Sequence, residues 1–216
     1  MPTSGAWPPR CSISWTNSLS LGDTPDAMLA AVVPMKSMDL AKSRLSGMLD
    51  AGGRHALARQ MFEHVLATLR EAGLASVHVA SGDQGTGDLN ADVAAAARRV
   101  QNDGATELLL VMADLPYLTA ADIAAVIEAG RKSAVVIAEA KDGGTNALLL
   151  RPPTALRFAF TTGRPSAAFH ADHARNRGIE PVFIRRPGLA RDIDTPDDLK
   201  ALVSDHPAYQ VFRHVA

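Results

Sequence analysis

The chain has 216 residues, of which 22 are Lys or Arg and 23 are Asp or Glu, and 47% of its residues are hydrophobic. A formal net charge of -1 excludes a protein that holds nucleic acid mainly through a basic excess, and a single cysteine excludes an internal disulfide. In the body of the chain the longest apolar stretch, residues 108–113, is far shorter than the ~20 residues that cross a bilayer. These numbers predict a globular cytoplasmic protein with neither nucleic acid nor a membrane as partner.

Residues 1–28 differ in composition from the rest of the chain. Pro, Ser, Thr and Gly interrupt any helical or strand period there, so we expect a poorly ordered N-terminal extension. Arg10 is its only basic residue and no apolar core follows it, which argues against a secretory signal. Met28 is a second candidate start of translation. We therefore assign the folded domain to residues 29–216.

From Leu29 onward, short apolar runs alternate with amphipathic segments. The apolar runs predict strands at residues 29–33, where Pro34 is expected to end the strand, and at 76–80, 107–112, 133–138, 146–150 and 182–184. The amphipathic segments predict helices at 53–71, 92–99, 119–130 and 166–176, with a last helix starting near Thr195. Continuous apolar strands that alternate with helices are typical of a mainly parallel sheet covered on both faces. The pattern predicts one three-layer α/β domain.

Three cations follow the first predicted strand: Lys36, Lys42 and Arg44. Ligands of open α/β sheets bind beyond the carboxyl ends of the strands, so these side chains are expected at a binding site. Arg presents a planar fork to phosphate oxygens and Lys a compact charge. The cluster is suited to a triphosphate, although a solvated loop with surface cations would show the same residues.

Carboxylates follow the strand at 107–112 and recur near the end of the chain. Asp114 comes directly after that strand, and Asp192 and Asp194 alternate around Ile193, so both are expected on one side of an extended segment. Together the three would offer oxygen ligands to Mg²⁺. The alternatives are a turn residue for Asp114 and a helix-capping role for Asp194.

Glycine-rich turns mark further candidate contacts. Residues 143–146 read Gly-Gly-Thr-Asn, and Gly163 and Ser166 flank the start of a predicted helix, where backbone N–H groups and hydroxyls suit an anion. A plain hairpin and a plain helix start fit the same residues. The polar loop at 84–90 could contact a base or ribose through side-chain amides. His170 and His173, three positions apart on the helix, are expected to be surface histidines rather than zinc ligands.

Taken in order, these blocks resemble one family, the CofC/FbiD-type guanylyltransferases, which are relatives of the molybdenum-cofactor nucleotidyltransferases. The resemblance rests on Val-Pro-x-Lys with Lys-Ser-Arg-Leu after the first strand, Ala-Asp-Leu-Pro at 113–116, Gly-Gly-Thr-Asn-Ala-Leu at 143–148 and Asp-x-Asp-Thr-Pro at 192–196. It runs from about Leu29 to Leu202. It implies a single nucleotidyltransferase domain, GT-A-like and Rossmann-like.

The family resemblance also implies an activity. Its members use GTP and Mg²⁺, for which Mn²⁺ is expected to substitute, to guanylylate 2-phospho-L-lactate, phosphoenolpyruvate or 3-phospho-D-glycerate in coenzyme F(420) biosynthesis. By position it implies metal ligation by Asp114, Asp192 and Asp194 and contacts to the phospho-acid by Thr145, Gly163 and Ser166. The resemblance implies that Lys36, Lys42 and Arg44 bind the triphosphate and act in catalysis together with Asp114. It also implies nucleotide contacts by Gln84, Gly85 and Asn90.

Two other functions remain open at this level. One is another nucleotidyltransferase, acting on molybdopterin or a sugar phosphate, and the other is a non-catalytic nucleotide-binding regulator on the same fold. A homodimer is a further arrangement that the residues leave open. Neither the identity of the phospho-acid nor the oligomeric state is encoded in a motif, because a methyl or hydroxymethyl difference is recognised by packing.

Overall fold

The computed structural model describes residues 28–35, 42–81, 86–160 and 165–214. Of the expected extension at 1–28, all but Met28 lies outside this part, as do four of the predicted site residues: Lys36, Gln84, Gly85 and Gly163. No helix in the described ranges has the length and apolarity needed to span a membrane.

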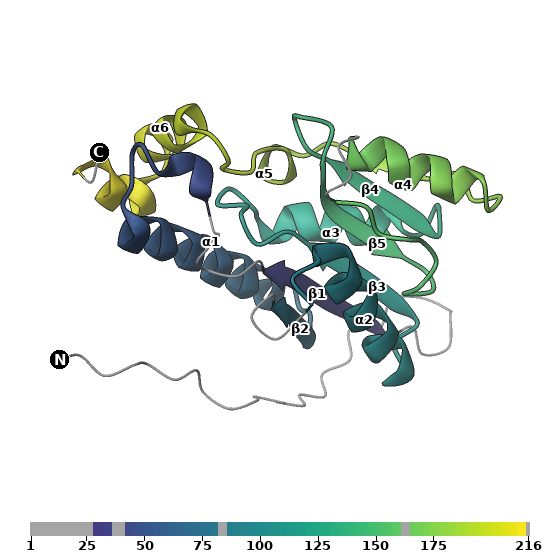
Figure 1. The fold of residues 1–216 in the computed structure, drawn as a ribbon. Coiled ribbons are helices and arrows are strands. Elements are labelled where there is room, and N and C mark those ends of the chain that lie inside the picture. The colour runs from purple at the N-terminus through teal and green to yellow at the C-terminus, as the bar shows by residue number, and fades with distance from the viewer. Residues whose placement is uncertain (1–27, 36–41, 82–85, 161–164, 215–216) are drawn as a thin grey trace.

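A sheet of six strands forms the centre of the fold (Figure 1). In chain order the strands are β1 (Leu29–Met35), β2 (Ser76–Ser81), β3 (Glu107–Val111), β4 (Val135–Glu139), β5 (Thr145–Leu150) and β6 (Val182–Ile184). Across the sheet they are arranged as β2-β1-β3-β5-β4-β6. All the pairings are parallel except those of β5, which runs antiparallel to both β3 and β4. The prediction of a mainly parallel sheet is thus confirmed.

The reversal of β5 determines what lies at the functional edge of the sheet. Because β5 runs opposite to its neighbours, its first residues, Thr145 and Asn146, lie at the edge where β3 and β4 end. The backbone N–H of Met112, just past β3, donates to the Asn146 carbonyl at 2.9 Å. Residues that follow parallel strands therefore meet residues that begin an antiparallel one.

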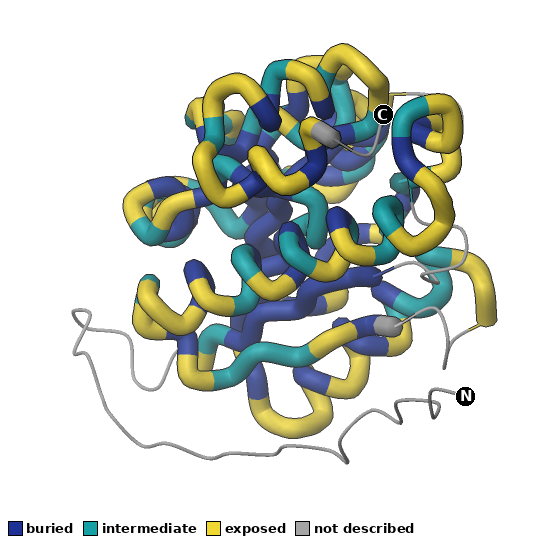
Figure 2. The backbone as a smooth tube through the Cα atoms, turned by 90° about the vertical axis from the view of Figure 1, so that its left-hand side faces the viewer, coloured by how far each residue is buried: buried dark blue, intermediate teal, exposed yellow. Residues whose placement is uncertain are grey.

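Helices cover both faces of the sheet. They are α1 (Ala51–Glu71), α2 (Leu89–Asn102), α3 (Ala120–Ala129), α4 (Ser166–Arg175), α5 (Pro187–Ala190) and α6 (Pro196–Asp205), with short 3-10 helices η2 (Ser43–Leu45) and η3 (Pro207–His214). Apolar residues of α2 and α4 form a core on one face, and residues of α1 and α3 form another on the opposite face. Figure 2 shows the central strands buried beneath helices whose outer sides are exposed. The three-layer prediction is confirmed.

A third apolar cluster lies beside the sheet. The first half of α1 packs there against η2, α6 and η3, through residues such as Leu45, Leu57, Leu202 and Phe212. Ile193 belongs to this cluster and is 1% exposed, as the alternation at 192–194 predicts. The cluster thereby fixes the segment that carries Asp192 and Asp194.

Most predicted boundaries differ from the observed ones by one to three residues, and two of these differences have a clear physical reason. β1 does not end at Pro34 but continues to Met35. The pairing of β1 with β3 ends at Val32, and beyond that residue β1 pairs with β2 alone, with Pro34 opposite Ala80. Proline has no backbone N–H to donate, and its absence is tolerated where the strand has a neighbour on one side only. The helix α2 begins at Leu89, three residues early, because the Asp88 side chain caps it by accepting from the Asn90 N–H at 2.9 Å.

Candidate active site

Three carboxylates meet at the functional edge of the sheet. Asp114 follows β3, while Asp192 and Asp194 lie between α5 and α6, yet one carboxylate oxygen from each lies within 4.8 Å of the others. All three side chains are partly buried. The predicted convergence of this acidic trio is confirmed as geometry, and its oxygen ligands are of the kind that Mg²⁺ takes.

The side chain of Lys42 lies among these carboxylates. Its Nζ donates to Asp114 Oδ2 at 2.6 Å and to Asp194 Oδ1 at 3.0 Å, and the side chain is 8% exposed. Burial alone would lower the pKa of Lys42, but the charges of Asp114 and Asp194 outweigh it and raise that pKa. Lys42 is therefore held as a cation. Its backbone adopts a left-handed conformation, with φ 53°, at the start of η2.

Arg44, in η2, lies further out. Its Nη1 is 3.9 Å from Asp194 Oδ2 and its side chain is 76% exposed, so this charge faces the entrance to the site. With three carboxylates and one buried ammonium, the fully ionised centre carries a net charge of -2. This net charge complements a divalent cation.

Asp192 is a carboxyl whose pKa is shifted by its surroundings. Burial and the nearby charge of Asp114 raise the pKa of Asp192 to about 6. The side-chain amide of Asn146 supports this group: its Nδ2 donates to the Leu189 carbonyl at 2.9 Å and lies 3.5 Å from Asp192 Oδ1. A residue at the start of β5 therefore orients a carboxylate that follows α5.

The capping alternative for Asp194 is not what the structure shows. The helix α6 is capped by Thr195, whose side chain accepts from the Asp198 N–H, while the Asp198 carboxylate accepts from the Thr195 N–H at 2.8 Å. Asp198 also accepts from the Asp194 backbone N–H at 3.3 Å. The carboxylate of Asp194 is therefore left to face Lys42.

Thr145 and Ser166 form the opposite side of the site. Ser166 is the first residue of α4, and both side chains are buried, with their hydroxyl oxygens 3.0 Å apart. The turn before β5 brings them together: Gly143, with φ +83°, packs beside Pro165, and its carbonyl accepts from the Ala167 N–H at 3.2 Å. A side chain at position 143 would be strained at that φ and crowd Pro165.

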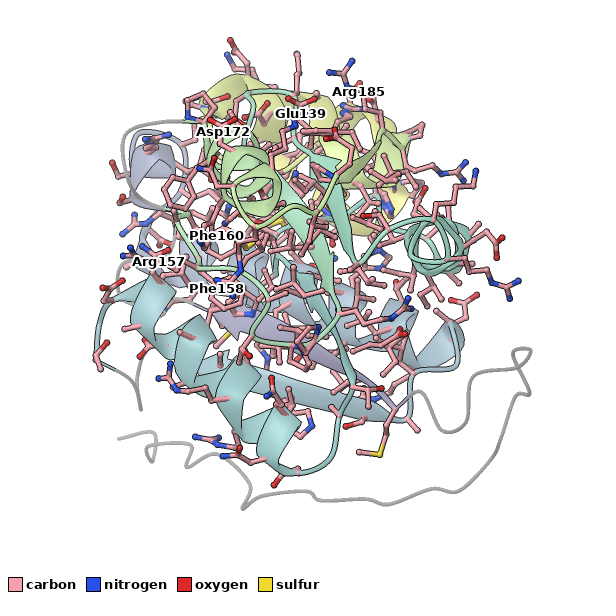
Figure 3. The ribbon with its side chains drawn as sticks, turned by 90° about the vertical axis from the view of Figure 1, so that its right-hand side faces the viewer. Glu139, Arg157, Phe158, Phe160, Asp172 and Arg185 are labelled. Atoms are coloured by element: carbon pink, nitrogen blue, oxygen red, sulfur yellow. The ribbon has the colours of Figure 1, made fainter. Side chains whose placement is uncertain are left out.

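A cavity of about 440 Å³ connects the acidic trio with these hydroxyls. Its polar wall includes Lys42, Arg44 and Asn146, and apolar side chains from Met61, Leu89 and Phe160 complete it. Phe160 stacks on Phe158 with ring centroids 6.1 Å apart, and Figure 3 shows the two rings close together between α4 and α2. The cavity therefore offers charge at one end and apolar and hydroxyl surface at the other.

Seven of the predicted site residues line this cavity: Lys42, Arg44, Asp114, Thr145, Ser166, Asp192 and Asp194. Asn90 lies elsewhere, in the first turn of α2, where its side-chain oxygen accepts from the Phe160 N–H at 2.7 Å. It thus supports a wall of the cavity. Its role in nucleotide binding stays a prediction, as do those of Lys36, Gln84, Gly85 and Gly163.

The roles of Asn146 and His170 beside the trio and the hydroxyl pair were not anticipated. In the sequence, Asn146 stands out only as the last residue of the Gly-Gly-Thr-Asn motif at 143–146. His170 was expected at the surface, which is wrong: it is completely buried, and its ring lies 5.0 Å from that of Phe160. The available signal was its spacing, because Ser166 and His170 are four residues apart and so share one face of α4.

The family model described as "Guanylyl transferase CofC like" matches residues 29–211. The chain is 40% identical over 191 residues to the phosphoenolpyruvate guanylyltransferase of Rubrobacter xylanophilus, covering 80% of this chain and 92% of the relative. It is 37% identical to the enzyme of that name from Sphaerobacter thermophilus, covering 82% and 93%. The 3-phospho-D-glycerate guanylyltransferase of Colwellia psychrerythraea is 33% identical, covering 79% and 89%.

Solved structures agree on the fold. A protein of Desulfovibrio desulfuricans G20, described as a nucleotide-diphospho-sugar transferase, superposes with a TM-score of 0.68 at 17% identity, covering 86% of this chain and 94% of that one. The 4-diphosphocytidyl-2C-methyl-D-erythritol synthase of Anaerococcus prevotii gives 0.52 at 12% identity, covering 79% and 94%. At these identities the likeness establishes the α/β fold alone.

Proposed function

Because the chain belongs to the CofC-like family of guanylyl transferases, we propose that it transfers GMP from GTP to a phosphorylated three-carbon acid and releases pyrophosphate. Phosphoenolpyruvate is the acid we propose first, since relatives with that name reach 40% and 37% identity, against 33% for the 3-phospho-D-glycerate enzyme. We propose that this reaction belongs to coenzyme F(420) biosynthesis, which the family resemblance supports. 2-Phospho-L-lactate and 3-phospho-D-glycerate are the competing substrates.

One observation carries the proposal: the acidic trio and the Thr145–Ser166 hydroxyl pair face a single cavity. A guanylyltransfer joins two polyanions, so it needs a place for cationic charge and a separate place for the acid. The trio supports the first, and the buried hydroxyls at the N-terminus of α4 support the second. Both lie where three neighbouring strands end or begin, which is the usual binding edge of an open α/β sheet.

The donors suit Mg²⁺, and Mn²⁺ by the same chemistry. Asp114, Asp192 and Asp194 offer only oxygen ligands. One carboxylate oxygen from each lies within 4.8 Å of the others, which fits a shared ion. Together with Lys42 the three side chains carry a net negative charge. When bound there, the divalent ion would neutralise charge on the phosphates that meet in the cavity. The raised pKa of Asp192, at about 6, is consistent with a carboxyl that is short of a positive partner.

The reaction needs no catalytic base from this chain. A phosphate monoester has its second pKa near ~6, so the acid substrate is largely dianionic at neutral pH and is itself the nucleophile. An oxygen of that phosphate forms a bond to the α-phosphorus of GTP while the bond from the α-phosphorus to the bridging oxygen breaks. Pyrophosphate carries away the electron pair. What the protein supplies is alignment of the two reactants and compensation of their charge.

Charge compensation is the larger task. Two unit charges ~4 Å apart repel by about 4 kcal/mol at an effective dielectric constant of ~20, and each reactant here carries several charges. Lys42 is a buried ammonium inside the cavity, and Arg44 brings an exposed guanidinium to its entrance. We assign both to the triphosphate, where they would offset charge that develops on the departing pyrophosphate.

A direct assay tests the proposal. The full-length protein is incubated with GTP and Mg²⁺ together with phosphoenolpyruvate, 3-phospho-D-glycerate or 2-phospho-L-lactate in parallel, and pyrophosphate release is measured. We expect release that requires an acid and is fastest with phosphoenolpyruvate, with ATP and CTP as nucleotide controls. Binding of GTP without release in any arm would instead support a regulator and refute the enzyme.

A further inference from the structure

His170 is a buried imidazole that the proposed chemistry does not use. It lies in the middle of α4 with no solvent exposure. Its Nδ1 is 3.0 Å from Thr145 Oγ1, and its Nε2 is 3.2 Å from the backbone nitrogen of Ala159. Both ring nitrogens are thus hydrogen-bonded, one to a cavity residue and the other to the main chain.

The main-chain contact fixes which ring nitrogen carries the proton. A backbone N–H can only donate, so Nε2 must offer its lone pair to Ala159. In a neutral imidazole the proton is then on Nδ1, which donates to Thr145. The neutral form is favoured because burial, assisted by the nearby His173, lowers the pKa of His170 to about 4.

The tautomer decides what the hydroxyl pair offers to the cavity. His170, Thr145 and Ser166 together hold three exchangeable protons: one on Nδ1 and one on each hydroxyl. The contacts from His170 to Thr145 and from Ser166 to Thr145 use two of them, so one hydroxyl proton is left over. Both hydroxyl residues line the cavity, which is where that proton can be donated. With the opposite tautomer Thr145 would have to donate to Nδ1, and no proton would remain.

We propose that His170 is a positioning residue, which by donating to Thr145 makes the Thr145–Ser166 pair a hydrogen-bond donor toward an acceptor-only oxygen, such as a phosphate or carboxylate oxygen of the acid substrate. The inference rests on the proposed function and deepens it by naming the residue that orients the hydroxyl protons at the Thr145–Ser166 end of the cavity, where the acid substrate is proposed to bind. An imidazole is suited to the task because its rigid ring links the Ala159 backbone to the hydroxyl pair. Phe160, packed edge-on against the same ring, closes the other side.

Two near-isosteric substitutions separate this role from simple packing. In His170→Asn the side-chain amide reaches the position of Nδ1 and can still donate to Thr145. In His170→Gln the amide reaches the position of Nε2 and can still accept from Ala159, but the donor to Thr145 is lost. His173→Asn is the matched control, because His173 lies on the same helix and its Nδ1 accepts from the Arg157 backbone instead.

The readout is the KM for the acid, with the KM for GTP as internal reference. Loss of one hydrogen bond to a charged group costs about tenfold to a hundredfold in affinity, so His170→Gln should raise the KM for the acid by that factor. His170→Asn and His173→Asn should stay within about threefold of wild type, and the KM for GTP should change less than about twofold. A folded His170→Gln with a wild-type KM for the acid, or equal losses in both His170 variants, would overturn the proposal.

Nitrogen-15 NMR of the histidine rings in the full-length wild-type protein gives a test that does not need turnover. The proposal requires the Nδ1–H tautomer at His170, assigned by comparison with the His170→Asn variant, and the Nε2–H tautomer would refute it. If wild-type protein releases no pyrophosphate with any of the three acids, the proposed function fails. The tautomer still decides whether the hydroxyl pair is set up as a donor.

Discussion

Asp114 and Asp197 are two aspartates with opposite surroundings. Asp114 faces Lys42 inside the cavity, whereas the side chain of Asp197 is 90% exposed and contacts only Lys200 among the ion pairs of the described residues. Asp114→Asn removes one charge of the acidic trio while Lys42 keeps its contact with Asp194, so we expect an intact fold by circular dichroism. Pyrophosphate release should fall by at least about a hundredfold.

Asp197→Asn is the control for that substitution. It changes the same chemical group in the first turn of α6, five residues after Asp192, without touching the cavity. Its turnover should match wild type. Near-normal turnover of Asp114→Asn would remove this carboxylate from the reaction.

The buried imidazole of His170 makes a pH-dependent contribution to stability. Its folded pKa of about 4 lies below the ordinary 6.5, so between these values the unfolded chain binds an extra proton. The stability that His170 contributes is therefore fully present above pH 6.5 and lost as the pH falls toward 4. At about 1.4 kcal/mol per pKa unit, the loss is on the order of 3 kcal/mol.

Asp192 acts in the opposite sense over part of this range. Its folded pKa of about 6 lies above the ordinary 3.8, so its protonation in the fold adds stability as the pH falls from 6 toward 4. Because Asp192 is present in both wild type and His170→Asn, its contribution cancels in the difference between their free energies of unfolding. Urea unfolding at pH 7 and pH 4.5 should show the free-energy difference between the two proteins shrinking or reversing at the lower pH. The same difference at both values would contradict a neutral His170.

Two helices with the same capping box provide a test at the level of elements. Thr119 with Asp122 caps α3, and Thr195 with Asp198 caps α6. Thr119→Ala and Thr195→Ala should each cost about 1 kcal/mol of unfolding free energy. Only the second box adjoins the site, since Asp198 also accepts from the Asp194 N–H. Thr195→Ala should therefore also lower kcat, by up to about tenfold.

The comparison of the two variants isolates the effect of position. Stability is measured by urea unfolding and kcat by pyrophosphate release under saturating substrates. Equal kcat in Thr119→Ala and Thr195→Ala, at similar stability loss, would show that the α6 cap does not help to place Asp194.

Elements with a strong local pattern were predictable, and those that depend on distant partners were not. The continuous apolar run of β3 and the capping signals at Thr119 and Thr195 identify their elements directly. The extension of β1 through Pro34 depends on where its neighbour β3 stops pairing, which no local pattern reveals. The helix α5, four residues long, is too short to show a period. His170 has the composition of a surface helix around it, and only its packing against Phe160 and Thr145 explains its burial.

At the scale of the whole molecule, the site is an assembly of remote segments. The two carboxylates that contact Lys42 lie 72 and 152 residues away from it along the chain. Sequence identified Lys42 and Asp114 because each follows a predicted strand, and strand ends in open α/β sheets share an edge. It identified Asp194 by its alternation with Asp192 in an extended segment. The insertion of Lys42 between the two carboxylates, however, follows from three-dimensional packing. The position of β5 between β3 and β4 in the sheet likewise could not be inferred from the sequence and is known only from the structure. A homodimer stays a prediction.

Because the acidic trio spans the chain, a cation bound there should stabilise the entire fold. A ligand that binds only the native state adds about 2.7 kcal/mol at 100 times its Kd. For a domain of this size that corresponds to a rise in Tm of roughly 5 to 10 °C. We expect Mg²⁺ or Mn²⁺ to raise the Tm of wild type and of Asp197→Asn by similar amounts, after displacing Lys42 from the carboxylates, and to leave Asp114→Asn almost unchanged. Thermal unfolding followed by circular dichroism over a metal titration measures this. An equal shift in Asp114→Asn would mean that the ion binds elsewhere, because loss of one of three carboxylates from a shared site must weaken it.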